Sequence, residues 1–217
     1  MSLEPYQRKF IEWAIEQNAL TFGTYTLKSG RVSPYFYDAA KFNKGSAFVS
    51  IGQFYADVLK NLELNYEVVF GSAYKGIPIA LSTVNALIEK YNLDIAYSFN
   101  RKEKKNHGEG GNIVGASLKG NVLIVDDVIS VGTAIRECLN IVIENGGNPV
   151  GIVIALDRQE RGTGEITVVQ QIEQEYNLPV KTIITLDNIV QYITERGGYE
   201  EHLIMIKEYQ DIYGVKK

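Results

Sequence analysis

Cysteine is nearly absent from this sequence of 217 residues, in which Cys138 is the only one. No disulfide can therefore form within the chain, which is typical of a protein from the reducing cytosol. Long apolar runs are missing as well, because none approaches the roughly 20 residues that a membrane-spanning helix needs. The N-terminal segment MSLEPYQRKFIEWAIEQN is charged and has no signal-peptide core. We therefore expect a soluble, cytoplasmic protein.

The sequence also has no excess of positive charge. Its 22 Lys and Arg residues against 26 Asp and Glu residues give a net charge of -4. The composition therefore indicates no surface for nucleic acid or for an anionic membrane. Two common nucleotide-phosphate motifs are lacking, since no GKS or GKT follows a glycine-rich loop and no GxGxxG follows a predicted strand. A polyanionic ligand would have to meet a local cluster of positive charge.

The pattern of apolar residues predicts an α/β protein with a mostly parallel sheet flanked by helices on both faces, because continuous apolar strands alternate with amphipathic helices. The predicted strands are 66–70, 95–99, 122–125, 150–156 and 180–185. The predicted helices are 5–18, 46–63, 76–91, 132–145, 165–176 and 187–211. Residues 20–38 alternate between apolar and polar and contain turn residues, so they predict a hairpin. We expect one domain over residues 1–217, with residues 1–40 as a small N-terminal hood.

The most informative segment is the loop that follows the apolar run VLIV. Asp126 and Asp127 come directly after it, and Ser130, Gly132 and Thr133 open the next helix. The N–H groups and the dipole of a helix N-terminus favour a phosphate, whereas two carboxylates suit sugar hydroxyls or a Mg²⁺ ion bridging them. A phosphate at one end and a diol at the other describe ribose 5-phosphate. Taken alone, the same residues also describe an acidic strand end before an ordinary capped helix.

A basic, glycine-rich segment, NRKEKKNHGEGGNIVGAS at residues 100–117, follows another predicted strand. It shows no helical periodicity, and a loop of this length in a compact domain is usually functional or disordered. Its first half carries Arg101, Lys102, Lys104, Lys105 and His107, opposed only by Glu103. A generic charge run is a solvated surface loop. This one, however, follows a strand whose carboxyl end lies at the same sheet edge as the acidic loop, so we interpret it as a mobile lid over a pyrophosphate leaving group.

A third loop, GSAYKG at residues 71–76, also follows a predicted strand. Small residues and Lys75 at the start of a helix indicate an anion pocket. Pyrophosphate is a reasonable ligand if this strand and the one before the acidic loop are neighbours. A lone lysine in a loop is otherwise usually just solvated.

Together these segments resemble those of a known family. The run VLIVDDVISVGTA is similar to the signature of type I phosphoribosyltransferases that binds phosphoribosyl pyrophosphate (PRPP). TLKSGRVSPYFYD, FGSAYKGIPIA, FNRKEKKNHGEGGNIVG and ALDRQERGTGE resemble the corresponding stretches of bacterial and fungal orotate phosphoribosyltransferases. The resemblance covers nearly the whole chain. It implies the type I phosphoribosyltransferase fold and a glycosyltransferase of pyrimidine biosynthesis, which uses Mg²⁺ to join orotate to PRPP and releases orotidine 5'-monophosphate and pyrophosphate.

The resemblance also implies roles for individual residues. Lys105, Asp126 and Asp127 are the expected catalytic residues. The residues expected to bind PRPP are Lys28, Tyr74, Lys75, Arg101, Lys102, Lys105, His107, Asp126, Asp127, Val128, Ile129, Ser130, Val131, Gly132, Thr133 and Ala134. Those expected to bind orotate are Phe36 and Tyr37, which would flank its ring, with Ser130 and Arg158.

Three further features are implied by the family. Lys28, Arg101 and Lys105 are expected to reach the neighbouring subunit, in a homodimer with shared active sites. Mg²⁺ is expected to be held mainly by PRPP, with contact to Asp126 and Asp127 through water. The peptide bond between Ala73 and Tyr74 is expected to be cis.

Arg158 has a chemical reason of its own to bind orotate. Orotate is a planar carboxylate, and a guanidinium fork binds such a group with two hydrogen bonds. The alternative is a surface arginine paired with Glu160 or Glu165. Two positions depart from the family pattern: similar enzymes often have phenylalanine in place of Tyr37 and threonine in place of Ser130. Both changes keep the ring or the hydroxyl, so we expect them to alter affinity rather than function.

Two alternative functions stay open at this stage. The first is transfer of the phosphoribosyl group to a purine or to uracil, against which Arg158 and the Phe36–Tyr37 pair argue. The second is a PRPP-sensing regulator without turnover. Such regulators usually carry a nucleic-acid-binding surface, which the net charge of -4 does not indicate. Whether Asp127 assists a proton transfer is not decided by the sequence.

Overall fold

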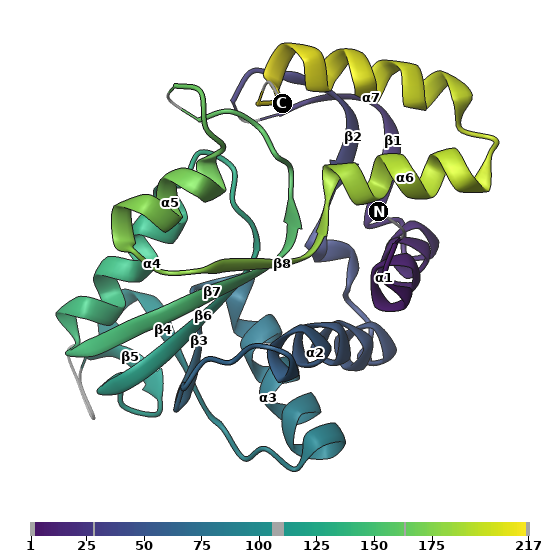
Figure 1. The fold of residues 1–217 in the computed structure, drawn as a ribbon. Helices are drawn as coiled ribbons and strands as arrows, with labels where there is room; N and C mark the ends of the chain where they lie inside the picture. Colours follow the sequence, from purple (N-terminus) through teal and green to yellow (C-terminus); the bar gives the residue numbers. More distant parts are fainter. Residues whose placement is uncertain (1–2, 28, 106–110, 163, 216–217) are drawn as a thin grey trace.

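A six-stranded sheet forms the centre of the molecule (Figure 1), as seen in a computed structural model that describes residues 3–27, 29–105, 111–162 and 164–215. The spatial order of the strands is β5-β4-β3-β6-β7-β8. Their bounds are β3 (Val68–Gly71), β4 (Ala96–Lys105), β5 (Gly111–Gly115), β6 (Gly120–Val128), β7 (Gly147–Asp157) and β8 (Val180–Thr185). Only β5 runs antiparallel to its neighbour, so the prediction of a mostly parallel sheet is confirmed.

The central parts of the strands are apolar because both faces of the sheet are covered there. Successive residues of a strand point to opposite faces, so Val69 and Leu123 lie in one hydrophobic cluster while Val68 and Ile124 lie in another. The first cluster includes side chains of α1, α2, α3, α6 and α7, and the second those of α4 and α5. Figure 1 shows α2 and α3 on one side of the sheet and α4 and α5 on the other. The α-helices are α1 (Pro5–Glu16), α2 (Gly45–Lys60), α3 (Gly76–Tyr91), α4 (Thr133–Glu144), α5 (Val168–Tyr176), α6 (Leu186–Arg196) and α7 (Glu200–Tyr213).

The hood, residues 1–40, packs against the C-terminal helix of the chain. The predicted hairpin forms a separate two-stranded antiparallel sheet of β1 (Leu20–Thr26) and β2 (Val32–Tyr37). Helix α7 packs on β2 (Figure 1). The sequence predicted one helical segment over 187–211, but the chain turns between α6 and α7 at Gly197 and Gly198, whose φ values of 71° and 78° favour glycine. This turn carries α7 back over the N-terminal hairpin.

The basic segment 100–117 is more regular than the sequence predicted. Strand β4 continues through Lys105 and pairs with β5, with Asn100 opposite Ile113. The segment expected to form the lid therefore begins in strand β4 and ends in strand β5, at the edge of the sheet. Because β3 ends at Gly71, opposite Phe99, the residues of β4 beyond Phe99 pair only with β5. This part of the sheet edge can expose charged side chains, which explains why it lacked an apolar signal. Residues 106–110 lie outside the described part of the chain, and the mobility of the lid stays a prediction.

Among the described residues, no helix is both long and apolar enough to cross a lipid bilayer.

Helices α2 and α3 pack closely against each other at Gly52. A Cβ atom at this position would lie 2.2 Å from the backbone oxygen of Ser82. We expect Gly52→Ala to lower the free energy of unfolding by roughly 1–3 kcal/mol, because overpacking forces backbone shifts. Gly45→Ala is the matched control in the same helix, since a Cβ atom there meets nothing within 4 Å. Urea denaturation measures both, and equal stability of the two variants would contradict this account of the contact.

Candidate active site

Three loops meet at the carboxyl edge of the sheet. Strand β3 lies between β4 and β6, and Gly71 is paired with Phe99 on one side and Val125 on the other. The GSAYKG loop, the lid hairpin and the acidic strand end are therefore neighbours, and the condition on which the pyrophosphate prediction depended is met. Open α/β sheets bind their ligands at this edge.

Asp126 and Asp127 are among the last residues of strand β6 rather than part of a loop, and their side chains are largely buried. The hydroxyl of Tyr55 donates to the backbone oxygen of Asp126 at 2.6 Å. The backbone N–H of Asp127 donates to Oδ1 of Asp126 at 2.9 Å. Burial and the neighbouring charge of Asp127 raise the pKa of Asp126 to about 7. Without ligand, the pair therefore carries fewer than two full charges near neutral pH.

Lys75 joins the acidic strand end to the hood. Its Nζ lies 2.8 Å from Oδ2 of Asp127 and 3.9 Å from Oδ1 of Asp38, which follows β2. Burial lowers the pKa of Lys75, but the hydrogen bond and charge of Asp127 together with Asp38 raise it by more. The prediction that this lysine lies beside the acidic loop is confirmed.

The GSAYKG loop is tightly packed against the start of α3. A Cβ atom on Gly71 would lie 2.0 Å from the backbone oxygen of Gly76, so only glycine fits there. The bond between Ala73 and Tyr74 is cis, as expected from the family resemblance. The backbone N–H of Ala73 donates to the side chain of buried Asn100 at 2.9 Å, which ties this loop to β4.

The loop from Val128 to the start of α4 presents a polar rim. Ser130, Val131 and Thr133 are exposed, and Gly132 adopts a φ of 83° immediately before the helix. Ile129 differs because its side chain is buried in the cluster beneath α4 and α5. Ile129 can therefore meet a ligand only through its backbone.

A groove of about 550 Å³ lies between the GSAYKG loop and β4. Its lining residues are Tyr74, Ile77, Phe99, Asn100, Arg101, Lys102 and Glu103. The Nζ of Lys102 is 5.1 Å from the centre of the Tyr74 ring, so residues of two predicted PRPP-binding segments meet here. Lys28 and His107 lie outside the described residues, and the side chain of Lys105 is also outside the described part.

Arg158 lies at the carboxyl end of β7 and is buried against the hood. Its Nε donates to Oε1 of Glu160 at 2.6 Å, and its Nη2 donates to Ser33 at 3.0 Å and to Tyr209 at 3.3 Å. The pairing with Glu160 that the sequence offered as an alternative does form, although the arginine is buried rather than on the surface. Tyr209 and Ser33 were not predicted: Ser33 lies within TLKSGRVSPYFYD but was given no role, Tyr209 lies in none of the motifs, and only the fold brings the two together.

Phe36 and Tyr37 point to opposite faces of β2 because they are consecutive strand residues. Phe36 is partly exposed and stacks on Tyr25, with ring centroids 5.4 Å apart. Tyr37 is buried in the hydrophobic core, where its hydroxyl has no hydrogen-bond partner among the described residues. The structure therefore does not bring the two rings to one side, where both could flank a single base.

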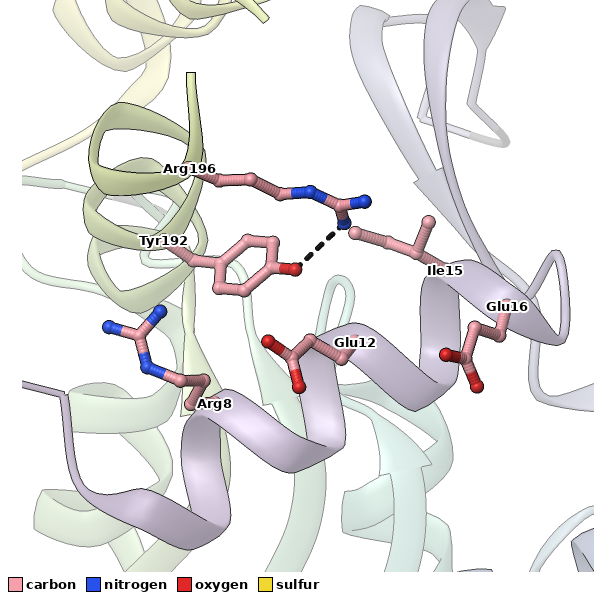
Figure 2. A pocket seen from close by; sticks show the side chains of 6 residues that line it. All are labelled: Arg8, Glu12, Ile15, Glu16, Tyr192 and Arg196. Atoms are coloured by element: carbon pink, nitrogen blue, oxygen red, sulfur yellow. Dashed lines mark hydrogen bonds between the residues drawn. The ribbon is translucent and has the colours of Figure 1, made fainter. Parts of the chain in front are cut away.

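A second groove, of about 390 Å³, lies between α1 and α6, away from the predicted site. Figure 2 shows the side chains that line it, with Arg196 donating to the hydroxyl of Tyr192 at 2.8 Å. The lining residues are Arg8, Glu12, Ile15, Glu16, Tyr192 and Arg196. Charges of both signs line this groove, and it contains none of the predicted site residues.

The chain matches the phosphoribosyl transferase domain family over residues 43–187. It is 51% identical over 213 residues to an orotate phosphoribosyltransferase of Escherichia coli O9:H4 (strain HS), covering 98% of this chain and 100% of that relative. A crystal structure of the orotate phosphoribosyltransferase of Francisella tularensis is 37% identical, with a TM-score of 0.84, covering 95% of this chain and 99% of that one. The Leishmania donovani UMP synthase shares only the fold, at 20% identity and a TM-score of 0.74, over 95% of this chain and 42% of that one.

The sheet, the acidic strand end and the family match define a phosphoribosyltransferase. Within that class, the full-length identity of 51% shows that the chain belongs to the orotate phosphoribosyltransferase family.

The buried Asp126 should make stability depend on pH. Its pKa is raised from 3.8 to about 7, so between these values the folded chain binds more protons and the free energy of unfolding falls as pH rises. Asp126→Asn should therefore be more stable than the wild type at pH 8, on the order of 4 kcal/mol, because the rise from 3.8 to about 7 is about three pKa units and each corresponds to about 1.4 kcal/mol.

Urea denaturation of the ligand-free protein at several pH values measures this difference. The gain should shrink as the pH falls toward 4. Asp94→Asn is the control, since it removes an exposed carboxylate and changes the net charge equally. A gain for Asp126→Asn that is independent of pH would contradict the assignment.

Proposed function

We propose that this site transfers the phosphoribosyl group of PRPP to orotate, forming orotidine 5'-monophosphate and pyrophosphate. The observation that carries the proposal is the buried Asp126–Asp127 pair beside the N-terminus of α4, at a sheet edge shared with Lys75. This arrangement offers carboxylates to a sugar diol and N–H groups to a phosphate within one strand–loop–helix unit. The similarity to orotate phosphoribosyltransferases over the full length of the chain supports orotate as the base.

The ribose 5-phosphate of PRPP would lie along residues 126–134. The exposed hydroxyls of Ser130 and Thr133 and the backbone before α4 would bind the 5-phosphate. Asp126 and Asp127 would accept hydrogen bonds from the ribose hydroxyls. Because Lys75 already neutralises Asp127, the two carboxylates would bind the diol without strong repulsion between the site and its anionic substrate.

The pyrophosphate would occupy the groove between the GSAYKG loop and β4. Tyr74 and Lys102 line this groove, and Lys75, the residue after Tyr74, has its Nζ 2.8 Å from Oδ2 of Asp127. Cations placed here stabilise the negative charge that develops on the leaving group, and such electrostatic stabilisation is usually the largest single contribution. On the strength of the family resemblance, we include in this role His107 of the lid, together with Arg101 and Lys105 of a neighbouring subunit.

Mg²⁺ is proposed as the cofactor, held mainly by PRPP. The oxygens of Asp126 and Asp127 are hard ligands of the kind that Mg²⁺ prefers. Among the described residues, no group of three or more His, Cys, Asp or Glu side chains is arranged to hold a metal ion, so the protein would contribute only part of the coordination. When bound, the ion would supply positive charge against the pyrophosphate.

Orotate would lie between the hood and the carboxyl end of β7. Arg158 would meet it there, with Phe36 on the exposed face of β2 and Ser130 opposite. The hydrogen bonds of Arg158 within the chain and the burial of Tyr37 change two details of the orotate site expected from the sequence. The guanidinium is already shared with protein groups, and only one ring of the Phe36–Tyr37 pair is exposed.

A spectrophotometric assay of orotate consumption tests the proposal directly. We expect turnover that requires both PRPP and Mg²⁺ and that stops when the metal is chelated. Replacing orotate by uracil, adenine or hypoxanthine should give little or no product. Asp126→Asn and Asp127→Asn should each lower kcat by roughly 100-fold or more, which corresponds to about 3 kcal/mol of lost transition-state stabilisation. Wild-type activity in the double variant would exclude the ribose site, and release of pyrophosphate would exclude a non-catalytic PRPP sensor.

We further propose a homodimer with shared sites, supported by the family resemblance. In it, Lys28, Arg101 and Lys105 would complete the site of the neighbouring subunit. The cytosol is the proposed location, because a lone buried cysteine suits a reducing compartment.

Mixing two inactive variants tests the shared site. Lys105→Ala and Asp127→Asn should each be inactive as homodimers. In a heterodimer, one site loses both residues and the other keeps both, so activity should return to about half that of a wild-type dimer. Verified subunit exchange without a return of activity would show that Lys105 acts within its own chain.

A further inference from the structure

The guanidinium of Arg158 is held by protein groups on several sides. Glu160 accepts from Nε, and Ser33 and Tyr209 accept from Nη2. The ring of Tyr35 lies beneath it, with the ring centre 4.3 Å from Cζ, and the ring of Tyr209 lies at 6.0 Å. An arginine with this many partners has lost most of its conformational freedom, so its remaining donors point in a defined direction.

Those remaining donors are on Nη1. An arginine has five N–H donors, one on Nε and two on each terminal nitrogen, and the three hydrogen bonds above use Nε and Nη2. Among the described residues, Nη1 has no hydrogen-bond partner, and it is not one of the buried atoms left without one. Nη1 therefore reaches solvent from an otherwise buried guanidinium.

Glu160 connects this arginine to the hood. Its Oε1 accepts from Arg158 and from the hydroxyl of Tyr209 at 2.7 Å, while its Oε2 accepts from Nη1 of Arg31 at 2.6 Å. Arg31 ends the turn between β1 and β2, and its Nη2 donates to the backbone oxygen of Arg161 at 3.2 Å. A single carboxylate thus joins the hairpin, the end of β7 and helix α7.

Tyr209 is suited to hold this arrangement in one orientation. Its hydroxyl donates to Glu160 and accepts from Arg158, so both of its hydrogen-bonding directions are used. Burial and the neighbouring Glu160 raise the pKa of Tyr209 to about 12, so the donor proton stays in place at neutral pH.

We propose that Glu160 and Tyr209 are positioning residues for recognition of the base: they fix the guanidinium of Arg158 so that its Nη1 edge meets the carboxylate of orotate. The inference rests on the proposed function. It limits the expected contact between Arg158 and the orotate carboxylate to Nη1, because Nη2 already donates to Ser33 and Tyr209. It also makes the C-terminal helix α7 a part of the base site, although none of its residues needs to touch the base.

Steady-state kinetics of Tyr209→Phe and Glu160→Gln test the proposal. Each should raise the KM for orotate by roughly 10-fold or more, since hydrogen bonds to charged groups are among the stronger ones. The KM for PRPP and the kcat should change far less. Tyr192→Phe is the matched control, because it removes another tyrosine hydroxyl that contacts an arginine, in the groove of Figure 2. It should leave both KM values unchanged.

A double-mutant cycle separates positioning from a general structural effect. If Tyr209 acts through Arg158, Tyr209→Phe should have little further effect on the KM for orotate in an Arg158→Lys background. Additive effects would overturn the proposal, as would equal rises in both KM values or an orotate KM unchanged in Tyr209→Phe and Glu160→Gln. Absence of PRPP-dependent orotate consumption by the wild-type protein would instead refute the proposed function. The wild-type assay therefore distinguishes the two failures.

Discussion

The pairing of β3 with both β4 and β6 is the constraint on which the site depends. Because these strands are parallel, their carboxyl ends lie at one edge and deliver three loops to the same place. Gly71 has no room for a side chain there, since a Cβ atom would lie 2.0 Å from the backbone of Gly76. The close packing of the β3–α3 turn brings Lys75 within 2.8 Å of Asp127. Charge complementarity in the site is therefore a consequence of strand order.

Two buried ionic groups are organised differently in this protein. Asp126 and Asp127 place two like charges together. Burial raises the pKa of Asp126, which favours its protonated form, and Lys75 lies beside the carboxylate of Asp127. Arg158 and Glu160 place opposite charges together. Ser33 accepts a hydrogen bond from Arg158, Arg31 donates to Glu160, and Tyr209 accepts from the first and donates to the second. Burying an ion pair is favourable only when such extra partners satisfy it. The first arrangement would change when a substrate binds, whereas the second holds a side chain in one orientation.

The hood depends on contacts between the two ends of the chain. Helix α7 returns to β2 after the turn at Gly197 and Gly198, and Tyr209 of α7 then accepts a hydrogen bond from Nη2 of Arg158, as Ser33 of β2 does. The proposed base side of the site is therefore assembled from β2, the end of β7 and α7. The proposed phosphate side lies within one continuous segment, residues 126–134. The two sides differ in how far apart in sequence their residues lie.

That difference explains what the sequence by itself determined. Continuous apolar strands and helical periodicity were sufficient for most of the sheet and most helices, because each is a short-range pattern. The run VLIVDDVISVGTA indicated the acidic strand end and the type I phosphoribosyltransferases, and the further segments that resemble the orotate enzymes indicated the family. Only the tertiary structure decided that β4 continues into a hairpin with β5 and that α7 packs on β2. It also decided that the side chain of Phe36 is partly exposed whereas that of Tyr37 is buried. It also decided the partners of Arg158, since hydrogen bonds between Ser33, Arg158 and Tyr209 join residues that no sequence period relates.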